Sequence, residues 1–262
     1  MRYLAVILLI VEVASALGCP LGCVCYSGKK RFWEQAECKG NGSTIFPANL
    51  SKNTTYLYMR NYTLHILNAS HFKGLIHMRR LEIYRSSFHY IAEDTFSGLK
   101  NLMTLSVAFS VHRSIKKGLF QPLKKLRVLH LSSIQLTSLD PEIFCGLDDL
   151  VSVDIRNNRL SRIENYTFSA LPNLTHIDIS ENKLMYIGAA SFSGLDNLER
   201  LDLSQNKLST IHNDTFSGLN KLEDLFLHEN RIDYIDGQLF SGLKNVEQLN
   251  LGCNFIQGIE EG

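Results

Sequence analysis

The stretch Leu198–Lys221, LERLDLSQNKLSTIHNDTFSGLNK, decides the fold, because it returns along the chain at a fixed spacing of 24 residues. An unbroken register over eight full copies indicates a repeat protein rather than an ordinary globular domain. A ninth copy stops at Gly262 before it is complete. The copies begin at Thr54, Met78, Leu102, Leu126, Leu150, Leu174, Leu198, Leu222 and Val246.

The copies share fixed columns of residue types. The ninth place is asparagine in the later copies, whereas earlier copies carry other residues there, such as Tyr62 and Ser86. An asparagine side chain can hydrogen-bond its own turn and the neighbouring copy, so the later half should be the more regular one. The asparagines are Asn158, Asn182, Asn206, Asn230 and Asn254. The nineteenth place is always phenylalanine, at Phe72, Phe96, Phe120, Phe144, Phe168, Phe192, Phe216 and Phe240.

The start of each copy has the pattern of a β-strand with one buried side. In the stretch quoted above, Leu201 and Leu203 alternate with Asp202 and Ser204. One copy cannot bury its apolar side alone, but copies stacked at roughly 4.8 Å per strand form a parallel sheet over a continuous core. The strand side packs more closely than the return side, so the stack should curve with the sheet on its concave surface.

The order Leu-x-x-Leu-x-Leu-x-x-Asn-x-Leu in residues 198–208 resembles the extracellular leucine-rich repeat family with 24-residue repeats. The resemblance covers residues 54–262. It implies an α/β solenoid, namely a right-handed horseshoe with a parallel sheet on its concave face. The expected organisation is a signal peptide at 1–18, a cysteine-rich N-terminal cap at 19–53 and nine repeats at 54–262, the last incomplete.

Residues 1–18 have the pattern of a cleaved secretory signal peptide. Arg2 precedes an apolar run from Leu4 to Val11, and Ala14-Ser15-Ala16 has the small-x-small pattern of a cleavage site. An uncleaved membrane anchor is the alternative, but the run is shorter than the roughly 20 apolar residues of a membrane-spanning helix. No later stretch approaches that length. The chain is therefore expected to be secreted, or to be the extracellular part of a membrane receptor if the sequence continues.

Four of the six cysteines crowd near the start of the expected mature chain, at Cys19, Cys23, Cys25 and Cys38. An exported chain favours disulfides. A zinc site is the alternative, but no matching histidine pair accompanies the cluster. Four cysteines allow three pairings. The resemblance to the N-terminal caps of extracellular leucine-rich repeat proteins implies Cys19 with Cys25 and Cys23 with Cys38.

Cys145 and Cys253 lie more than four repeats apart, which is too far for a bond between them. They are expected to be unpaired thiols. The alternatives are an intermolecular bridge through Cys253, or a partner cysteine in a carboxy-terminal piece beyond Gly262. The last repeat presents an uncovered apolar edge, which predicts fraying or self-association at that end. Its residues are Leu249, Leu251, Ile256 and Ile259.

No motif predicts catalysis, a cofactor or a metal. The net charge of +1 gives no nucleic-acid footprint, and His228-Glu229 lacks the second histidine of a zinc protease motif. The row Asp154, Asp178 and Asp202 could suggest a cation site, but it is more simply the outward position of a repeated strand. We expect no enzyme and no nucleic-acid ligand.

Eight glycosylation sequons follow the pattern Asn-x-Ser/Thr. Most fall on the convex side or near the N-terminal end, and only Asn61 borders the strand surface. Sugars there would leave the sheet bare and available to a partner. The acceptors are Asn41, Asn49, Asn53, Asn61, Asn68, Asn165, Asn173 and Asn213.

The outward strand positions form the expected ligand surface, with an aromatic and basic early end and an acidic later end. Tyr, Phe and Arg are enriched at the centres of protein interfaces, and opposite charge at two ends fixes a ligand's direction. The predicted contact residues are Tyr56, Tyr58, Arg80, Tyr84, Arg85, Phe109, Asp154, Asp178, Asp202, Asp224 and Phe226.

The favoured function is an extracellular recognition module that binds a protein or glycan on its concave face. The resemblance extends this interpretation to ectodomains such as those of Slit proteins, Toll-like receptors and variable lymphocyte receptors. The alternative is a structural matrix protein similar to the small leucine-rich proteoglycans, which organise other polymers.

Overall fold

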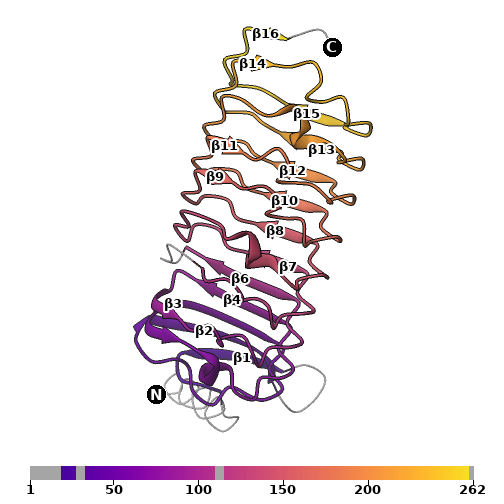
Figure 1. Ribbon diagram of the computed structural model, residues 1–262. Helices are drawn as coiled ribbons and strands as arrows, with labels where there is room; N and C mark the ends of the chain where they lie inside the picture. The colour runs from indigo at the N-terminus through magenta and orange to yellow at the C-terminus, as the bar shows by residue number, and fades with distance from the viewer. Residues whose placement is uncertain (1–18, 28–32, 110–114, 260–262) are drawn as a thin grey trace, which may run out of the picture.

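The computed structural model describes residues 19–27, 33–109 and 115–259, and the predicted signal peptide lies outside them. The chain winds into coils stacked along one axis, so that it forms one long solenoid (Figure 1). One sheet of twelve strands runs the length of the stack. Its successive strands are β1 (Cys23–Ser27), β2 (Trp33–Ser43), β3 (Tyr56–Leu67), β4 (Arg80–Tyr84), β6 (Thr104–Ala108), β7 (Val128–His130), β8 (Ser152–Asp154), β10 (His176–Asp178), β12 (Arg200–Asp202), β13 (Asp224–Phe226) and β15 (Gln248–Asn250), while β5 (Ser87–Ile91) pairs with the second half of β3.

The return side of each coil is mostly irregular, and the described residues contain no α-helix. Its regular parts are short 3-10 turns and pairs of two-residue strands. The turns are η1 (Ala69–Phe72), η2 (Pro141–Phe144) and η3 (Asn213–Phe216), and the strand pairs are β9 (Arg162–Ile163) with β11 (Tyr186–Ile187) and β14 (Tyr234–Ile235) with β16 (Gly258–Ile259).

The strands pair in parallel in the register that the repeat predicts. Tyr56 lies opposite Arg80, and Arg80 lies opposite Thr104, so paired residues are 24 apart in the chain. The same offset joins His176 to Arg200 and Arg200 to Asp224. Each column of the repeat therefore becomes a row of side chains that runs along the stack.

The phenylalanine column forms the back of the core. Seven of its members, Phe72 to Phe216, are at most 2% exposed, and Phe240 is partly buried. Neighbouring rings stack, with centroids 5.4 Å apart for Phe144 and Phe168 and 5.8 Å apart for Phe168 and Phe192. Leucine and isoleucine side chains from the strands fill the space in front of this spine.

The asparagine row joins each coil to the one before it. Asn182 is 7% exposed, its Oδ1 accepts from the Leu160 backbone N–H of the preceding coil, and its Nδ2 donates to the carbonyl of Ile155 in that coil. The same Nδ2 donates to the carbonyls of Ile179 and Ser180 in its own turn. Buried backbone groups that have no strand partner are thus satisfied by one side chain.

A second asparagine row, which the sequence analysis missed, lies in the loops before the strands. Asn101 Nδ2 donates to the carbonyl of Ile76 at 2.9 Å, and Asn197 Nδ2 donates to the carbonyl of Pro172 at 2.9 Å. Asn173 and Asn245 make the same contact one coil back. Hydrogen bonds therefore join the loops of successive coils at this edge, just as the buried asparagines join the turns that follow the strands.

The turn after each strand requires a left-handed backbone. Residues at this place have φ between 48° and 57°, and they include Arg85, Phe109, Glu181 and Cys253. Asparagine tolerates this conformation better than bulky residues do, and Asn61 and Asn157 occupy the same place in their coils. Large side chains in this column are therefore held at a conformational cost.

The N-terminal segment closes the first coil. β1 pairs antiparallel with β2, and β2 pairs in parallel with β3, so the segment adds strands to the end of the main sheet. Disulfides join Cys19 to Cys25 and Cys23 to Cys38, which is the pairing that the resemblance implies, and Cys38 is fully buried. Cys145 and Cys253 are free and exposed.

The other end of the stack is more open. Leu249 is 41% exposed, Phe255 is 65% exposed, and Leu251 and Ile256 are only partly buried. Self-association through this edge stays a prediction.

Replacing Asn182 by alanine should lower the free energy of unfolding by about 1 to 3 kcal/mol, because the Leu160 N–H and the Ile155 carbonyl lose their partner while buried. Ser86→Ala should cost less, because a hydroxyl has one proton to donate, here to the Tyr84 carbonyl, whereas the Asn182 amide has two. Urea unfolding followed by circular dichroism measures both. Lys183→Ala, at an exposed neighbouring position, is the control and should change stability by less than about 0.5 kcal/mol. Equal losses for Asn182 and Lys183 would contradict this role of the row.

Cys23→Ser should destabilise the first coils by about 2 to 5 kcal/mol, since it opens the disulfide to buried Cys38. Cys145→Ser is the matched control, because that thiol is free and exposed, and it should leave stability unchanged. Differential scanning calorimetry under oxidising conditions separates the two. A thiol assay that found Cys23 reactive in the folded wild-type chain would contradict the pairing.

Candidate functional site

The outer surface of the main sheet, called the sheet face below, carries the predicted ligand residues on its strands and on the turns that follow them. At its early end Tyr56, Arg80 and Glu82 form one connected group. Arg80 Nε donates to Glu82 Oε1 at 2.5 Å, its guanidinium lies over the Tyr56 ring at 5.5 Å, and the Tyr56 hydroxyl donates to Glu82 Oε2 at 3.4 Å. Burial, and next the negative charge of Glu82, raise the pKa of Tyr56 to about 12, so this phenol stays a neutral donor at neutral pH. Tyr58 is half-buried on the same strand.

Tyr84, Arg85 and Phe109 form a second group at the strand ends, called the aromatic cluster below. The rings of Tyr84 and Phe109 are 4.9 Å apart, and the Arg85 guanidinium lies 5.4 Å from the centroid of the Tyr84 ring. Phe109 is 49% exposed. Arg85 and Phe109 both border a hollow of about 240 Å³ that is also lined by Asn61 and Tyr62.

The later, acidic part of the sheet face is less available than its sequence suggests. Asp178 Oδ1 accepts from the N–H and the hydroxyl of Ser180, and Asp202 makes the same two contacts with Ser204. Asp154 accepts from the Arg156 N–H, and its side chain is only 14% exposed. Each of these carboxylates is therefore hydrogen-bonded to the turn that follows its own strand.

Burial raises the pKa of Asp154 above its ordinary value, and the negative charge of Asp178 adds to the shift, while hydrogen bonding and charge from Arg156 oppose it. Folding therefore disfavours the carboxylate form of Asp154. Among the described residues, no group of three or more His, Cys, Asp or Glu side chains could hold a metal ion.

Phe226 differs from the expectation of an exposed contact residue. It is 9% exposed, because the Arg200 guanidinium covers its ring at 4.5 Å. Arg200 is held there by an ion pair with Asp224 at 3.1 Å, across neighbouring strands. A ligand at this place would meet Arg200 and Asp224 rather than the ring.

The sequon asparagines are accessible to different degrees. Asn41, Asn49, Asn53, Asn61, Asn165 and Asn173 are exposed, whereas Asn68 and Asn213 are half-buried. Asn213 Nδ2, the atom that a glycan would use, donates to Asp236 Oδ2 at 2.7 Å. Glycosylation at these positions stays a prediction.

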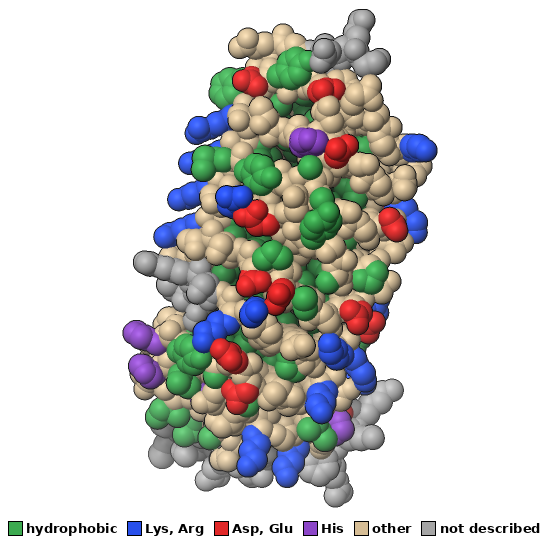
Figure 2. Space-filling model, viewed as in Figure 1, with side chains coloured by type: hydrophobic (Ala, Val, Ile, Leu, Met, Phe, Trp, Pro, Cys, Tyr) green, Lys and Arg blue, Asp and Glu red, His purple; other side chains and the backbone are tan. Residues whose placement is uncertain are grey.

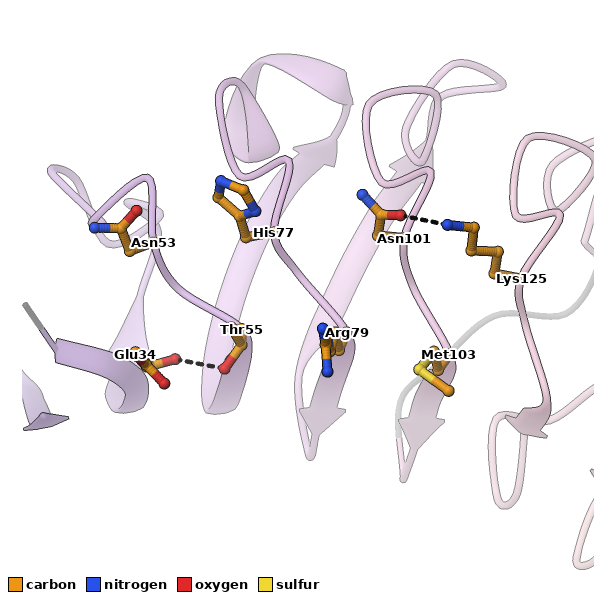
Figure 3. Close-up of a pocket in the computed structure, with 8 residues that line it drawn as sticks. All are labelled: Glu34, Asn53, Thr55, His77, Arg79, Asn101, Met103 and Lys125. Atoms are coloured by element: carbon orange, nitrogen blue, oxygen red, sulfur yellow. Dashed lines mark hydrogen bonds between the residues drawn. The ribbon is translucent and has the colours of Figure 1, made fainter. Parts of the chain in front are cut away.

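A polar groove of about 1000 Å³ lies on the loop edge of the early coils (Figure 3). Asn53, His77, Asn101 and Lys125 form one row along it, and Thr55, Arg79 and Met103 form a second row nearer the strands. Lys125 Nζ donates to Asn101 Oδ1 at 2.9 Å. Sequence reasoning missed this groove, although the rows repeat at the spacing of the repeat and could have been found from it.

Comparisons with known proteins agree with this geometry. The family model described as leucine rich repeat matches residues 100–160, 148–208, 185–232 and 221–262, and the chain therefore belongs to the leucine-rich repeat family. A search of curated proteins returned no match.

Several solved structures have the same fold. TLR13, in a complex with a single-stranded RNA, is 28% identical with a TM-score of 0.78 over 83% of this chain and 32% of its own. Toll, in the Toll–Spatzle complex from Drosophila, is 24% identical with a TM-score of 0.82 over 88% of this chain and 31% of its own. A leucine-rich repeat protein of Leptospira interrogans is 21% identical with a TM-score of 0.61 over 79% of this chain and 57% of its own.

The right-handed solenoid with a parallel sheet on its concave face is thus confirmed, and it is built with little helix. This chain spans about a third of the length of the TLR13 and Toll chains. The TLR13 complex contains RNA, so the expectation that nucleic acid is excluded as a ligand is not supported. None of the helices in the described residues is long and apolar enough to cross a membrane.

Asp154→Asn should raise the free energy of unfolding at pH 7, by an amount of the order of 1 kcal/mol or less, because it removes a desolvated charge and keeps the acceptor for the Arg156 N–H. The folded-state pKa is raised, so the carboxylate weakens the fold above that pKa. The gain should shrink as the pH falls through the folded-state pKa and vanish at about pH 3, where Asp154 is protonated in both states. Urea unfolding of both chains at pH 7 and pH 3 measures this. A variant that is less stable than wild type at pH 7 would show that the ion pair with Arg156 outweighs burial.

Proposed function

We propose that the sheet face is the ligand-binding surface of a non-catalytic extracellular recognition domain, which binds a protein or a glycan. The observation that carries this proposal is the aromatic cluster. Arg85 and Phe109 occupy the turn place with φ of 48° and 52°, although asparagine suits that place better. The left-handed backbone recurs at this place along the stack, as at Glu181 and Cys253, so it belongs to the repeat. What distinguishes the cluster is that an exposed ring and an exposed cation occupy this place in neighbouring coils.

The chemistry of the cluster suits a buried interface centre. Tyr, Phe and Arg supply large contact areas and charged hydrogen bonds, and their mutual packing reduces the entropy lost when a partner orders them. The hollow of about 240 Å³ beside Arg85 and Phe109 offers space for one inserted side chain or sugar ring. The acids of the later coils then make the surface asymmetric in charge and favour one ligand direction.

The cellular setting is part of the proposal. Two disulfides in the first coils are typical of oxidising compartments, and the Toll and TLR13 structures share the fold over most of this chain. We propose the division into a signal peptide at 1–18, a cap at 19–53 and repeats from 54 onward, with sugars on the sequon asparagines. What Toll and TLR13 bind shows that this fold can take a protein or an RNA.

The test begins with the secreted chain on arrays of extracellular proteins and glycans, with single-stranded RNA as a third class. For the partner found, Tyr84→Ala combined with Arg85→Ala should weaken binding by about tenfold or more, which is about 1.4 kcal/mol. The matched control is Lys116→Ala combined with Lys117→Ala on the return side, where the lysines form exposed ion pairs to Glu93 and Glu142 and Lys116 also lies 5.5 Å from the centroid of the Tyr90 ring. Surface plasmon resonance measures both. Greater damage from the lysine pair would refute binding on the sheet face.

Arg85→Asn separates binding from folding. Asparagine favours the left-handed turn, so this variant should be at least as stable as wild type while it binds more weakly. If this variant bound the partner as tightly as the wild type, Arg85 would not be part of the ligand-binding surface.

A further inference from the structure

A row of four cations follows the edge of the later coils, away from the sheet face. Arg159, Lys183, Lys207 and Arg231 are all exposed, and each follows directly after an asparagine of the buried row. They lie at the turn between the main sheet and the return side, where β9 and β11 begin. Figure 2 shows Lys and Arg side chains one above another along that edge of the upper half of the stack. We call these four residues the basic row.

The spacing of the basic row is fixed by backbone hydrogen bonds. The Lys183 N–H donates to the carbonyl of Leu160 at 2.9 Å, and the Lys207 N–H donates to the carbonyl of Leu184 at 2.9 Å. Arg159 and Arg231 make the same bond one coil back, at 2.7 and 2.8 Å. Successive cations therefore start about 4.8 Å apart on a rigid frame, and the four span roughly 14 Å.

Among the described residues, none neutralises these charges by an ion pair. No ion pair within the described residues includes any of the four, and no side-chain hydrogen bond of theirs is present there. The acids nearest in sequence are Glu181, Glu229 and Asp233. Glu181 and Glu229 lie in the turn column that borders the sheet face, and Glu229 accepts from Gln205 there. Asp233 is exposed two residues after Arg231 and forms no ion pair with it. Aligned like charges without counterions favour an anionic ligand.

The row has definite ends. The equivalent place is Gln135 in the coil before and Phe255 in the coil after, and Phe255 is 65% exposed. The positive surface is thus a short straight line rather than a broad patch. That shape suits a linear polymer whose negative charges repeat along its length.

We infer that the basic row is a second binding site, for a sulfated polysaccharide that lies along the stack. A single-stranded nucleic acid is the other linear polyanion, but it needs aromatic platforms on which successive bases stack. The flanking return-side column offers Tyr186 and Tyr234 with Thr210 between them, and the Arg162 guanidinium covers the Tyr186 ring at 5.2 Å. The assignment of a sulfated polysaccharide as the ligand rests on the extracellular setting proposed above. The assignment of the basic row as an anion-binding site does not depend on that setting.

The test uses heparin as the probe and the full chain as the protein. A variant with Arg159, Lys183, Lys207 and Arg231 all changed to glutamine should bind heparin about tenfold or more weaker, and the slope of log affinity against log salt should flatten by about three. The control changes Lys52, Lys73, Lys100 and Lys244 to glutamine, which removes the same charge from exposed positions elsewhere. It should lose less than about threefold, since net charge acts only at long range.

The outcomes separate the alternatives. Equal losses in the two variants, or no loss in the first, would overturn the site. Heparin stripped of its sulfates should bind far more weakly, and equal binding would overturn sulfate recognition. Tighter binding of single-stranded poly(U) RNA, lost with the same four changes, would assign the row to nucleic acid instead.

A milder variant, Lys183→Gln with Lys207→Gln, separates loss of heparin binding from loss of folding. It should bind heparin more weakly while its melting temperature stays that of the wild type. Tyr84→Ala with Arg85→Ala should leave heparin binding intact, so this site can fail or hold independently of the sheet face.

Discussion

The buried asparagine row is the constraint on which the later coils depend. A strand only three residues long cannot satisfy the backbone groups of the turn that follows it, and those groups are sealed from water by the next coil. One amide side chain per coil supplies an acceptor and a donor at that point, as Asn182 does for Leu160 and Ile155. Because these asparagine hydrogen bonds recur in each of the later coils, those coils keep one spacing.

A fixed spacing turns each column of the sequence into a physical row. The phenylalanine column becomes a spine of stacked rings, and the column after the buried asparagines becomes the basic row. The turn column is held in a left-handed conformation, so whichever side chain occupies it is presented at a set angle. Binding surfaces on this scaffold are therefore preorganised, and their chemistry can change without disturbing the core.

The repeat alone predicted the register, the parallel sheet, the phenylalanine spine and the asparagine row, because each follows from spacing and side-chain type. It could not predict contacts between side chains of neighbouring coils. The Arg200 guanidinium lies over the Phe226 ring of the next strand, and the Arg156 side chain lies 3.4 Å from the Asp154 carboxylate, which is only 14% exposed. The second asparagine row was also missed. Asn101 and Asn197 occupy the same place in their copies, but other copies carry different residues there, such as His77 and Lys125, so the column is not evident in the sequence.

Native-state hydrogen exchange of the wild-type chain tests the central constraint most directly. The amides of Leu160, Leu184 and Leu208 each donate to an asparagine Oδ1 of the following coil. They should exchange slowly, with similar protection, in one cooperative unit with the strands beside them. If these three amides exchanged as fast as exposed loop amides such as that of Lys244, the asparagine row would not hold the coils together.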